Sequence, residues 1–134
     1  MNNFFSKYKF IFHFCNFILI FLYLYPGSIL GWLFYNNLSQ QPQITSDFYF
    51  SNLKISTNHV YAFFVFSIIG FFSYKELYQL KLLSIYLVFL SIILEILHLF
   101  IPLRTFQFSD LFGNLLGVLI ILFLFYFFKR NENS

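Results

Sequence analysis

The chain has 134 residues, of which 60% are hydrophobic and 26% aromatic, while only 10% carry a charge. This composition excludes an ordinary soluble domain and predicts an integral membrane protein with room for about four crossings of roughly 20 residues each. The formal net charge of +3 comes from bases that flank apolar runs. These bases therefore indicate membrane orientation, and we expect no nucleic acid partner.

The first apolar run, 10–25, follows a short N-terminus that carries Lys7 and Lys9. No small-x-small cleavage pattern follows the run, which predicts an uncleaved transmembrane helix and not a signal peptide. His13 and Asn16 lie three residues apart on one face of this helix. For these two side chains, a hydrogen bond between helices is favoured over a ligand role.

The segment between the first and second predicted helices is mixed in character. Its apolar part, 29–35, is too short to span a membrane. Trp32 and Tyr35 favour an interfacial or re-entrant piece at the level of the lipid head groups. The sequence does not separate these two arrangements from a simple loop.

Three further apolar segments complete the predicted bundle, at 57–74, 82–101 and 111–128. The predicted fold class is therefore all-α, an integral membrane bundle of four transmembrane helices in one domain, 1–134. Candidate N-caps precede two of these helices, and a proline is expected to end the other. These residues are Ser56, Thr57 and Asn58 for 57–74, Pro102 for 82–101, and Ser109 or Asp110 for 111–128.

The basic residues are distributed unequally between the two ends of this bundle. One end has only Lys54 and Arg104. The other end carries six bases, Lys7, Lys9, Lys75, Lys81, Lys129 and Arg130. Because cytoplasmic flanks are rich in bases, we predict a multi-pass protein of the inner (plasma) membrane with both termini in the cytoplasm.

Polar residues are concentrated near the predicted outer end of the bundle. Helical spacing turns Glu95 and His98 to one face of the third helix, and Asp110 and Asn114 to one face of the fourth. Glu95 lies about 9 Å below the end of its helix and Asn114 about 6 Å below Asp110, so they share one layer. His59 opens the second helix on the same side. Charges at such depth are costly and indicate a functional site.

Two glycines, Gly113 and Gly117, accompany this polar stripe on the fourth helix. A small-xxx-small pair allows another helix to approach closely. We expect such a contact on the Asn114 face, with a homo-oligomer through the pair as one form of it.

The spacing of these polar residues resembles the signature of VanZ-like membrane proteins. That family has an acidic residue, Gln three later, Arg six after the Gln, Asp six after the Arg, and then Asn and Gly. The matching positions are Glu95, His98, Arg104, Asp110, Asn114 and Gly117. The resemblance is strongest over 57–128, where a helix also begins with a histidine followed by aromatic residues, and it implies a single VanZ-like membrane domain.

The chain departs from the family pattern in two places. His98 stands where Gln is usual, and Ile55 and Ser56 stand where the family has an Asp-Lys pair before His59. Imidazole keeps the hydrogen-bonding capacity of an amide and adds proton chemistry near neutral pH. The resemblance also implies an effect on glycopeptide antibiotic susceptibility.

One interpretation is an outward-facing polar pocket that binds or modifies the head group of an envelope lipid or a lipid-linked glycan precursor. Arginine can hold a phosphate through two hydrogen bonds, and a carboxylate beside imidazole supplies an acid/base pair. The candidate acid/base residues are Glu95, Asp110, His59 and His98. The candidate ligand-binding residues are Arg104, Ser109 and Asn114. Whether the pocket is catalytic, and for which substrate, stays open.

Two other interpretations remain beside the pocket. In the non-catalytic one, Glu95 pairs with Arg104 and the polar cluster only holds the second to fourth helices together. In the other, Glu95 and His98 form an E-x-x-H motif that binds a metal with His59 and Asp110. A di-iron bundle needs two such motifs, and Arg104 would repel a cation. We therefore expect no metal and no cofactor.

Overall fold

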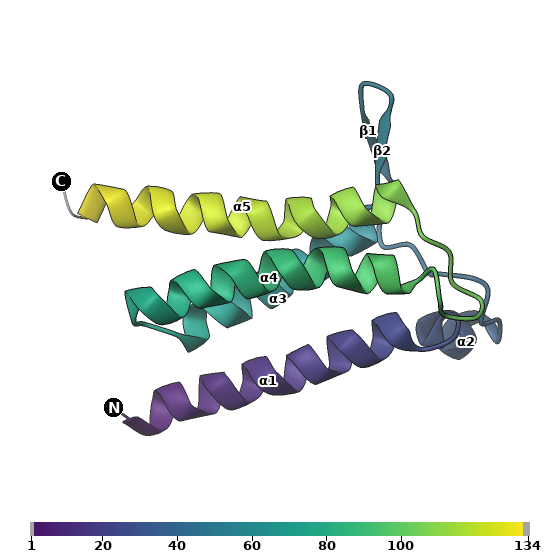
Figure 1. Cartoon of the computed structure of the whole chain (residues 1–134). Coiled ribbons are helices and arrows are strands. Elements are labelled where there is room, and N and C mark those ends of the chain that lie inside the picture. Colours follow the sequence, from purple (N-terminus) through teal and green to yellow (C-terminus); the bar gives the residue numbers. More distant parts are fainter. Residues whose placement is uncertain (1, 133–134) are drawn as a thin grey trace.

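The computed structural model describes residues 2–132, which form five helices and one two-stranded sheet. In chain order these are α1 (Asn2–Leu24), α2 (Ile29–Tyr35), β1 (Phe48–Phe50), β2 (Leu53–Ile55), α3 (Thr57–Ser73), α4 (Leu77–Leu97) and α5 (Phe108–Glu132). The four long helices lie side by side and alternate in direction, so α1 begins and α5 ends at the same end (Figure 1). The segment that holds α2 and the strands, together with the α4–α5 connection, lies at the opposite end, which we call the hairpin end.

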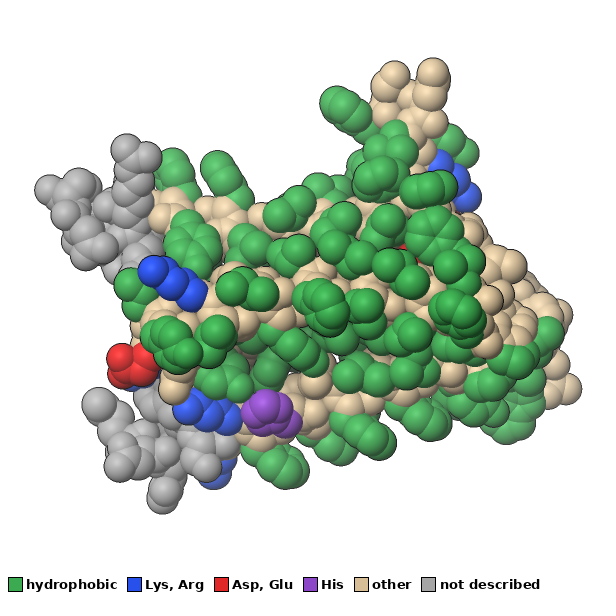
Figure 2. Space-filling view, in the orientation of Figure 1, with side chains coloured by type: hydrophobic (Ala, Val, Ile, Leu, Met, Phe, Trp, Pro, Cys, Tyr) green, Lys and Arg blue, Asp and Glu red, His purple; other side chains and the backbone are tan. Residues whose placement is uncertain are grey.

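Three of the described helices are long and apolar enough to cross a membrane, over Lys7–Leu24, Leu77–Leu97 and Phe108–Phe128. The fourth long helix, α3, is also apolar but has only 17 residues. Hydrophobic side chains cover most of the face of the molecule seen in Figure 2, and the basic side chains visible there lie towards its two ends. These features indicate a membrane protein, while a fourth crossing by α3 stays a prediction.

The boundaries of the third and fourth predicted helices need correction. α4 ends at Leu97, because the amides of His98 and Leu99 bond to carbonyls three residues back and tighten the last turn before Pro102 is reached. α5 begins at Phe108, so Ser109 and Asp110 lie in its first turn and are not its caps. Asp110 still complements the positive end of the helix dipole there.

The segment between α1 and α3 contains secondary structure that the sequence did not reveal. Ser28 Oγ accepts a hydrogen bond from Gly31 N at 2.9 Å and caps α2, which ends at Asn36 in the left-handed conformation with φ 53°. β1 and β2 then pair antiparallel. Their turn includes Ser51 at φ 58°, a residue type with little preference for such a conformation.

The side chain that caps α3 does not belong to the predicted N-cap residues, Ser56, Thr57 and Asn58. Ser56 is at the N-cap position but makes no capping hydrogen bond with its side chain. Instead, Asp47 Oδ1 accepts from Thr57 N at 3.1 Å, and Asp47 Oδ2 lies 3.0 Å from Lys54 Nζ on the second strand. One carboxylate thus joins the hairpin to the start of α3.

The predicted close helix contact at Gly113 and Gly117 is confirmed, and the partner helix is α3 of the same chain. A Cβ atom added to Gly113 would lie 2.5 Å from Ser56 O, and one added to Gly117 would lie 2.5 Å from Val60 O. α3 thus occupies this face in the single chain, and a homo-oligomer through the pair stays a prediction.

The interpretation of His13 and Asn16 as residues that link helices is also confirmed. His13 Nε2 lies 3.3 Å from the hydroxyl of Tyr74, just after α3, and Asn16 Oδ1 accepts from the Tyr86 hydroxyl of α4 at 2.7 Å. These contacts join α1 to its neighbours at the end opposite the hairpin.

Candidate functional site

The predicted polar layer forms a buried cluster at the hairpin end, contributed by α3, α4 and α5. Glu95 and Asn114 have no exposed surface, and the other members are at most 8% exposed. The members are His59, Glu95, His98, Asp110 and Asn114. Helical spacing predicted the shared faces of Glu95, His98, Asp110 and Asn114, and His59, which was expected only on the same side, is buried with them.

A sixth residue, Tyr23 of α1, lies at the centre of this cluster. Its hydroxyl donates to Asn114 Oδ1 at 2.8 Å and lies 3.1 Å from His59 Nδ1. Its ring stacks on the ring of His98 with a centroid distance of 5.8 Å. Tyr23 is one of ten tyrosines, and nothing in the local sequence distinguished it from the others.

Asn114 connects the helices through both ends of its amide. Its Nδ2 donates to Ser91 O on α4 at 3.2 Å, while its Oδ1 lies 2.9 Å from His59 Nδ1. On its other side, His59 Nε2 lies 3.5 Å from Asp110 Oδ2. Contacts of Asn114 and Asp110, both on α5, therefore link this helix to His59 on α3, and Asn114 also links it to α4.

Glu95 and His98 form a second pair within the cluster. Glu95 Oε1 accepts from Gln107 N at 2.8 Å. Glu95 Oε2 lies 3.2 Å from His98 Nδ1, but it has no hydrogen-bond partner among the described residues. The second ring nitrogen of His98 lies 3.1 Å from Tyr23 O, so this imidazole joins α4 to α1.

Arg104 does not pair with Glu95, which corrects the pairing expected in the non-catalytic interpretation. Its Nη2 donates to Leu22 O at 2.9 Å and its Nε donates to Tyr25 O at 3.3 Å. Carbonyls at a helix C-terminus lack intrahelical partners and attract cations, which explains this choice. Burial lowers the pKa of the Arg104 guanidinium, and the nearby Tyr23, Glu95 and Asp110 oppose that shift.

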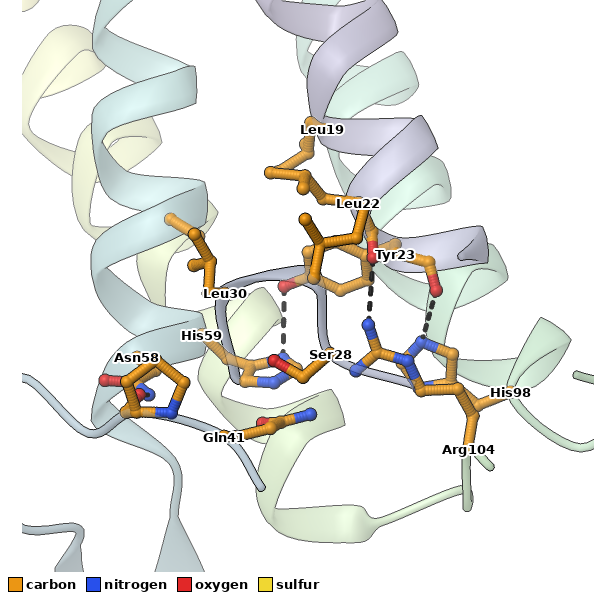
Figure 3. Close-up of a pocket in the computed structure, with 13 residues that line it drawn as sticks. Leu19, Leu22, Tyr23, Ser28, Leu30, Gln41, Asn58, His59, His98 and Arg104 are labelled. Carbon is orange, nitrogen blue, oxygen red and sulfur yellow. Dashed lines mark hydrogen bonds between the residues drawn. The ribbon is translucent and has the colours of Figure 1, made fainter. Parts of the chain in front are cut away.

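Two hollows meet at this cluster. The first has a volume of about 170 Å³ and is lined by Tyr23, His59, His98 and Arg104 among others (Figure 3). The second, of about 290 Å³, is lined mainly by polar residues that include Asp110 and Ser109. Four residues line both, namely Gln41, Asn58, His98 and Arg104.

Ser109 lies beside the cluster and not inside it. It is half-buried, and its hydroxyl lies 3.2 Å from Asp110 Oδ1 and 3.4 Å from Gln107 Oε1. Its backbone carbonyl accepts from Ser56 N at 3.0 Å. Ser109 therefore helps to hold α5 against the start of α3, at the wall of the larger hollow.

Three residues of the cluster have the donor atoms that a metal ion requires. One ligand atom from each of His59, Glu95 and Asp110 lies within 4.8 Å of the others, and all three residues are buried. The structure thus brings together the carboxylates and imidazole that the E-x-x-H pattern alone did not connect.

Comparisons of the chain with protein-family models, curated proteins and solved structures find no match.

Proposed function

We propose that the chain is a VanZ-like membrane protein that crosses the membrane four times and recognises a lipid or glycan-precursor head group at its hairpin end. In support of the fourth crossing, α3 lies within the bundle and runs opposite to α4 (Figure 1). Its 17 residues extend about 26 Å, at the lower limit for a membrane span.

The polar hollow of about 290 Å³ at the hairpin end carries this proposal. Among its lining residues are Arg104, Gln107, Asp110 and Lys54, which can hold an anionic group and its hydroxyls. The two hydrogen bonds of Arg104 to α1 use two of the five N–H donors of a guanidinium. Its remaining donors suit a phosphate.

The proposed orientation places the hairpin end outside and both termini in the cytoplasm of the inner (plasma) membrane. It rests on the excess of bases at the opposite end of the bundle. In this orientation the hollow meets the outer head-group layer, where envelope lipids and lipid-linked glycan precursors are exposed. Cytoplasmic reporters fused to the C-terminus should be active, and activity at Gln41 instead would reverse the orientation.

Mass spectrometry of the full chain released from native membranes with its bound lipids tests the ligand. We expect an anionic lipid or lipid-linked precursor to remain on the native protein. Gln41→Trp obstructs both hollows without removing a hydrogen bond of the bundle, so it should lose that ligand, as should Arg104→Gln. Lys81→Gln removes a charge at the opposite end and should retain it. Equal retention by all four proteins would reject the proposal.

The non-catalytic alternative is favoured by a specific observation. Tyr23, His59 and Asn114 bond to each other across three helices, and Arg104 bonds to the end of α1. These contacts hold the bundle together without any ligand. If Arg104→Lys and Glu95→Gln both destabilise the protein and no lipid is retained by the native chain, the cluster is a scaffold. Glycopeptide susceptibility of cells that express each variant supplies an independent measurement.

A further inference from the structure

We propose that His59, Glu95 and Asp110 bind one divalent transition-metal ion such as Zn²⁺ between α3, α4 and α5. The three ligand atoms already lie within 4.8 Å of one another. Two atoms bound to one tetrahedral Zn²⁺ at about 2.0–2.1 Å are about 3.3 Å apart. His59 Nε2 and Asp110 Oδ2 are 3.5 Å apart, so this pair is close to that separation. Small side-chain rotations would bring Glu95 to the same ion.

The unpartnered oxygen of Glu95 is an independent observation that favours a cation. Glu95 has no exposed surface, and its Oε2 has no hydrogen-bond partner among the described residues. A buried carboxylate oxygen without a partner is costly, because desolvation of an ion costs several kcal/mol. A metal ion would satisfy this oxygen directly.

The hydrogen bonds around His59 prepare its outer nitrogen for metal binding. The single hydroxyl proton of Tyr23 is directed to Asn114 Oδ1, and this oxygen only accepts, because the amide nitrogen donates to Ser91 O. The contact of 2.9 Å between His59 Nδ1 and Asn114 Oδ1 therefore requires a proton on Nδ1. In neutral imidazole, Nε2 then carries a free lone pair and lies 3.5 Å from Asp110 Oδ2. Metal-binding histidines are commonly oriented by such a second hydrogen bond.

His98, which lies beside Glu95, is also oriented by a hydrogen bond. Its Nε2 must donate to the carbonyl of Tyr23, so in neutral imidazole Nδ1 carries no proton, and it lies 3.2 Å from Glu95 Oε2. Neutral His98 therefore supplies no donor to this oxygen, which leaves it available to a cation. His98 is thus placed to orient Glu95 or to bind the ion beside it.

The charge of the cluster also suits a cation. Neither Glu95 nor Asp110 forms a salt bridge with a Lys or Arg in the part of the chain that the structure describes. The guanidinium of Arg104, which the sequence suggested would repel a metal, is directed to the carbonyls at the end of α1. Because Asp110 lines the larger hollow, an ion has a route to the site and a face for water or a ligand.

Metal titration of the full chain in detergent tests this proposal. The protein is first treated with a chelator and then titrated with Co²⁺, whose visible absorption reports low-coordinate N/O ligation and which Zn²⁺ should displace. We expect one ion per chain. His59→Ala, Glu95→Gln and Asp110→Asn should each weaken binding at least tenfold. The matched controls His13→Ala and Glu76→Gln lie at the opposite end and should leave binding unchanged.

Metal binding by the native protein tests the proposal even if a variant fails to fold. Absence of stoichiometric Co²⁺ or Zn²⁺ binding by the native chain would overturn the proposal, as would tight binding that the three substitutions leave intact in folded protein. Zn²⁺ should also raise the unfolding midpoint of the native chain, because a ligand that binds only the folded state stabilises it. The titration contains no head-group ligand, so its failure would leave the head-group proposal standing, and the reverse also holds.

Discussion

Replacing Tyr23 by Phe removes the one hydroxyl that joins α1 to the polar cluster. This hydroxyl donates to Asn114 Oδ1 at 2.8 Å. The ring keeps its edge contact with Phe63 at a centroid distance of 5.7 Å and its stacking on His98. The substitution therefore separates the contribution of the hydrogen bond from the contribution of aromatic packing.

The structure sets the expected size of this effect. A net intramolecular hydrogen bond contributes about 0.5–1.5 kcal/mol, and bonds between membrane helices average about 0.6 kcal/mol. Asn114 Oδ1 keeps His59 Nδ1 as a partner at 2.9 Å, so no buried acceptor is left unpaired. We expect Tyr23→Phe to cost about 1 kcal/mol of unfolding free energy. Tyr23→Ala also removes the ring and should cost about 3–5 kcal/mol.

Unfolding in mixed micelles with increasing dodecyl sulfate measures these costs, with the single tryptophan, Trp32, as the fluorescent probe. A double-mutant cycle with Asn114→Leu gives the coupling energy between the two side chains. Tyr78→Phe is the matched control, because Tyr78 is 72% exposed. A coupling energy indistinguishable from zero, or an equal loss in the Tyr78 control, would refute the proposed link between α1 and α5.

Two further predictions concern helix packing and the hairpin. Gly117→Leu should separate α3 from α5, because a Cβ there would lie 2.5 Å from Val60 O, and overpacking costs about 1–3 kcal/mol in the same unfolding assay. For the hairpin, burial acts to raise the pKa of Asp47. Hydrogen bonds from Lys54 and Thr57 and the charge of Lys54 outweigh this effect, so the pKa of Asp47 lies below its ordinary value of 3.8. The carboxylate is therefore favoured by folding, and its stabilisation is present above pH 3.8 and is lost as the pH falls through the lowered pKa. Hydrogen-exchange protection of the Thr57 amide should decrease over that range.

Each of these two predictions has an outcome that contradicts it. An unchanged midpoint for Gly117→Leu would mean that α3 and α5 do not approach closely there. In Asp47→Asn, protection of Thr57 should be lower and independent of pH in the acidic range. Protection in the native chain that stays constant on acidification would show that Asp47 does not cap α3.

The membrane character of the chain and the inward faces of its helices were determined by the sequence alone. Apolar runs specify helices locally, and a period of 3.6 residues sets which side chains share a face. For this reason Glu95 and His98, and likewise Asp110 and Asn114, were placed correctly before any partner helix was known. The glycine spacing on α5 predicted a close contact by the same local reasoning.

The groups that each polar side chain contacts were decided only by the tertiary structure. The non-catalytic interpretation paired Arg104 with Glu95, but the unpaired carbonyls at the end of α1 lie within its reach. Tyr23 entered the cluster because α1 packs beside α3 and α4, and Asp47 became a cap because the hairpin folds back onto α3. Such contacts join residues far apart in the chain, and their energies depend on which helices become neighbours. Helical periodicity fixes the face on which a side chain lies, but only the packed fold decides what it meets.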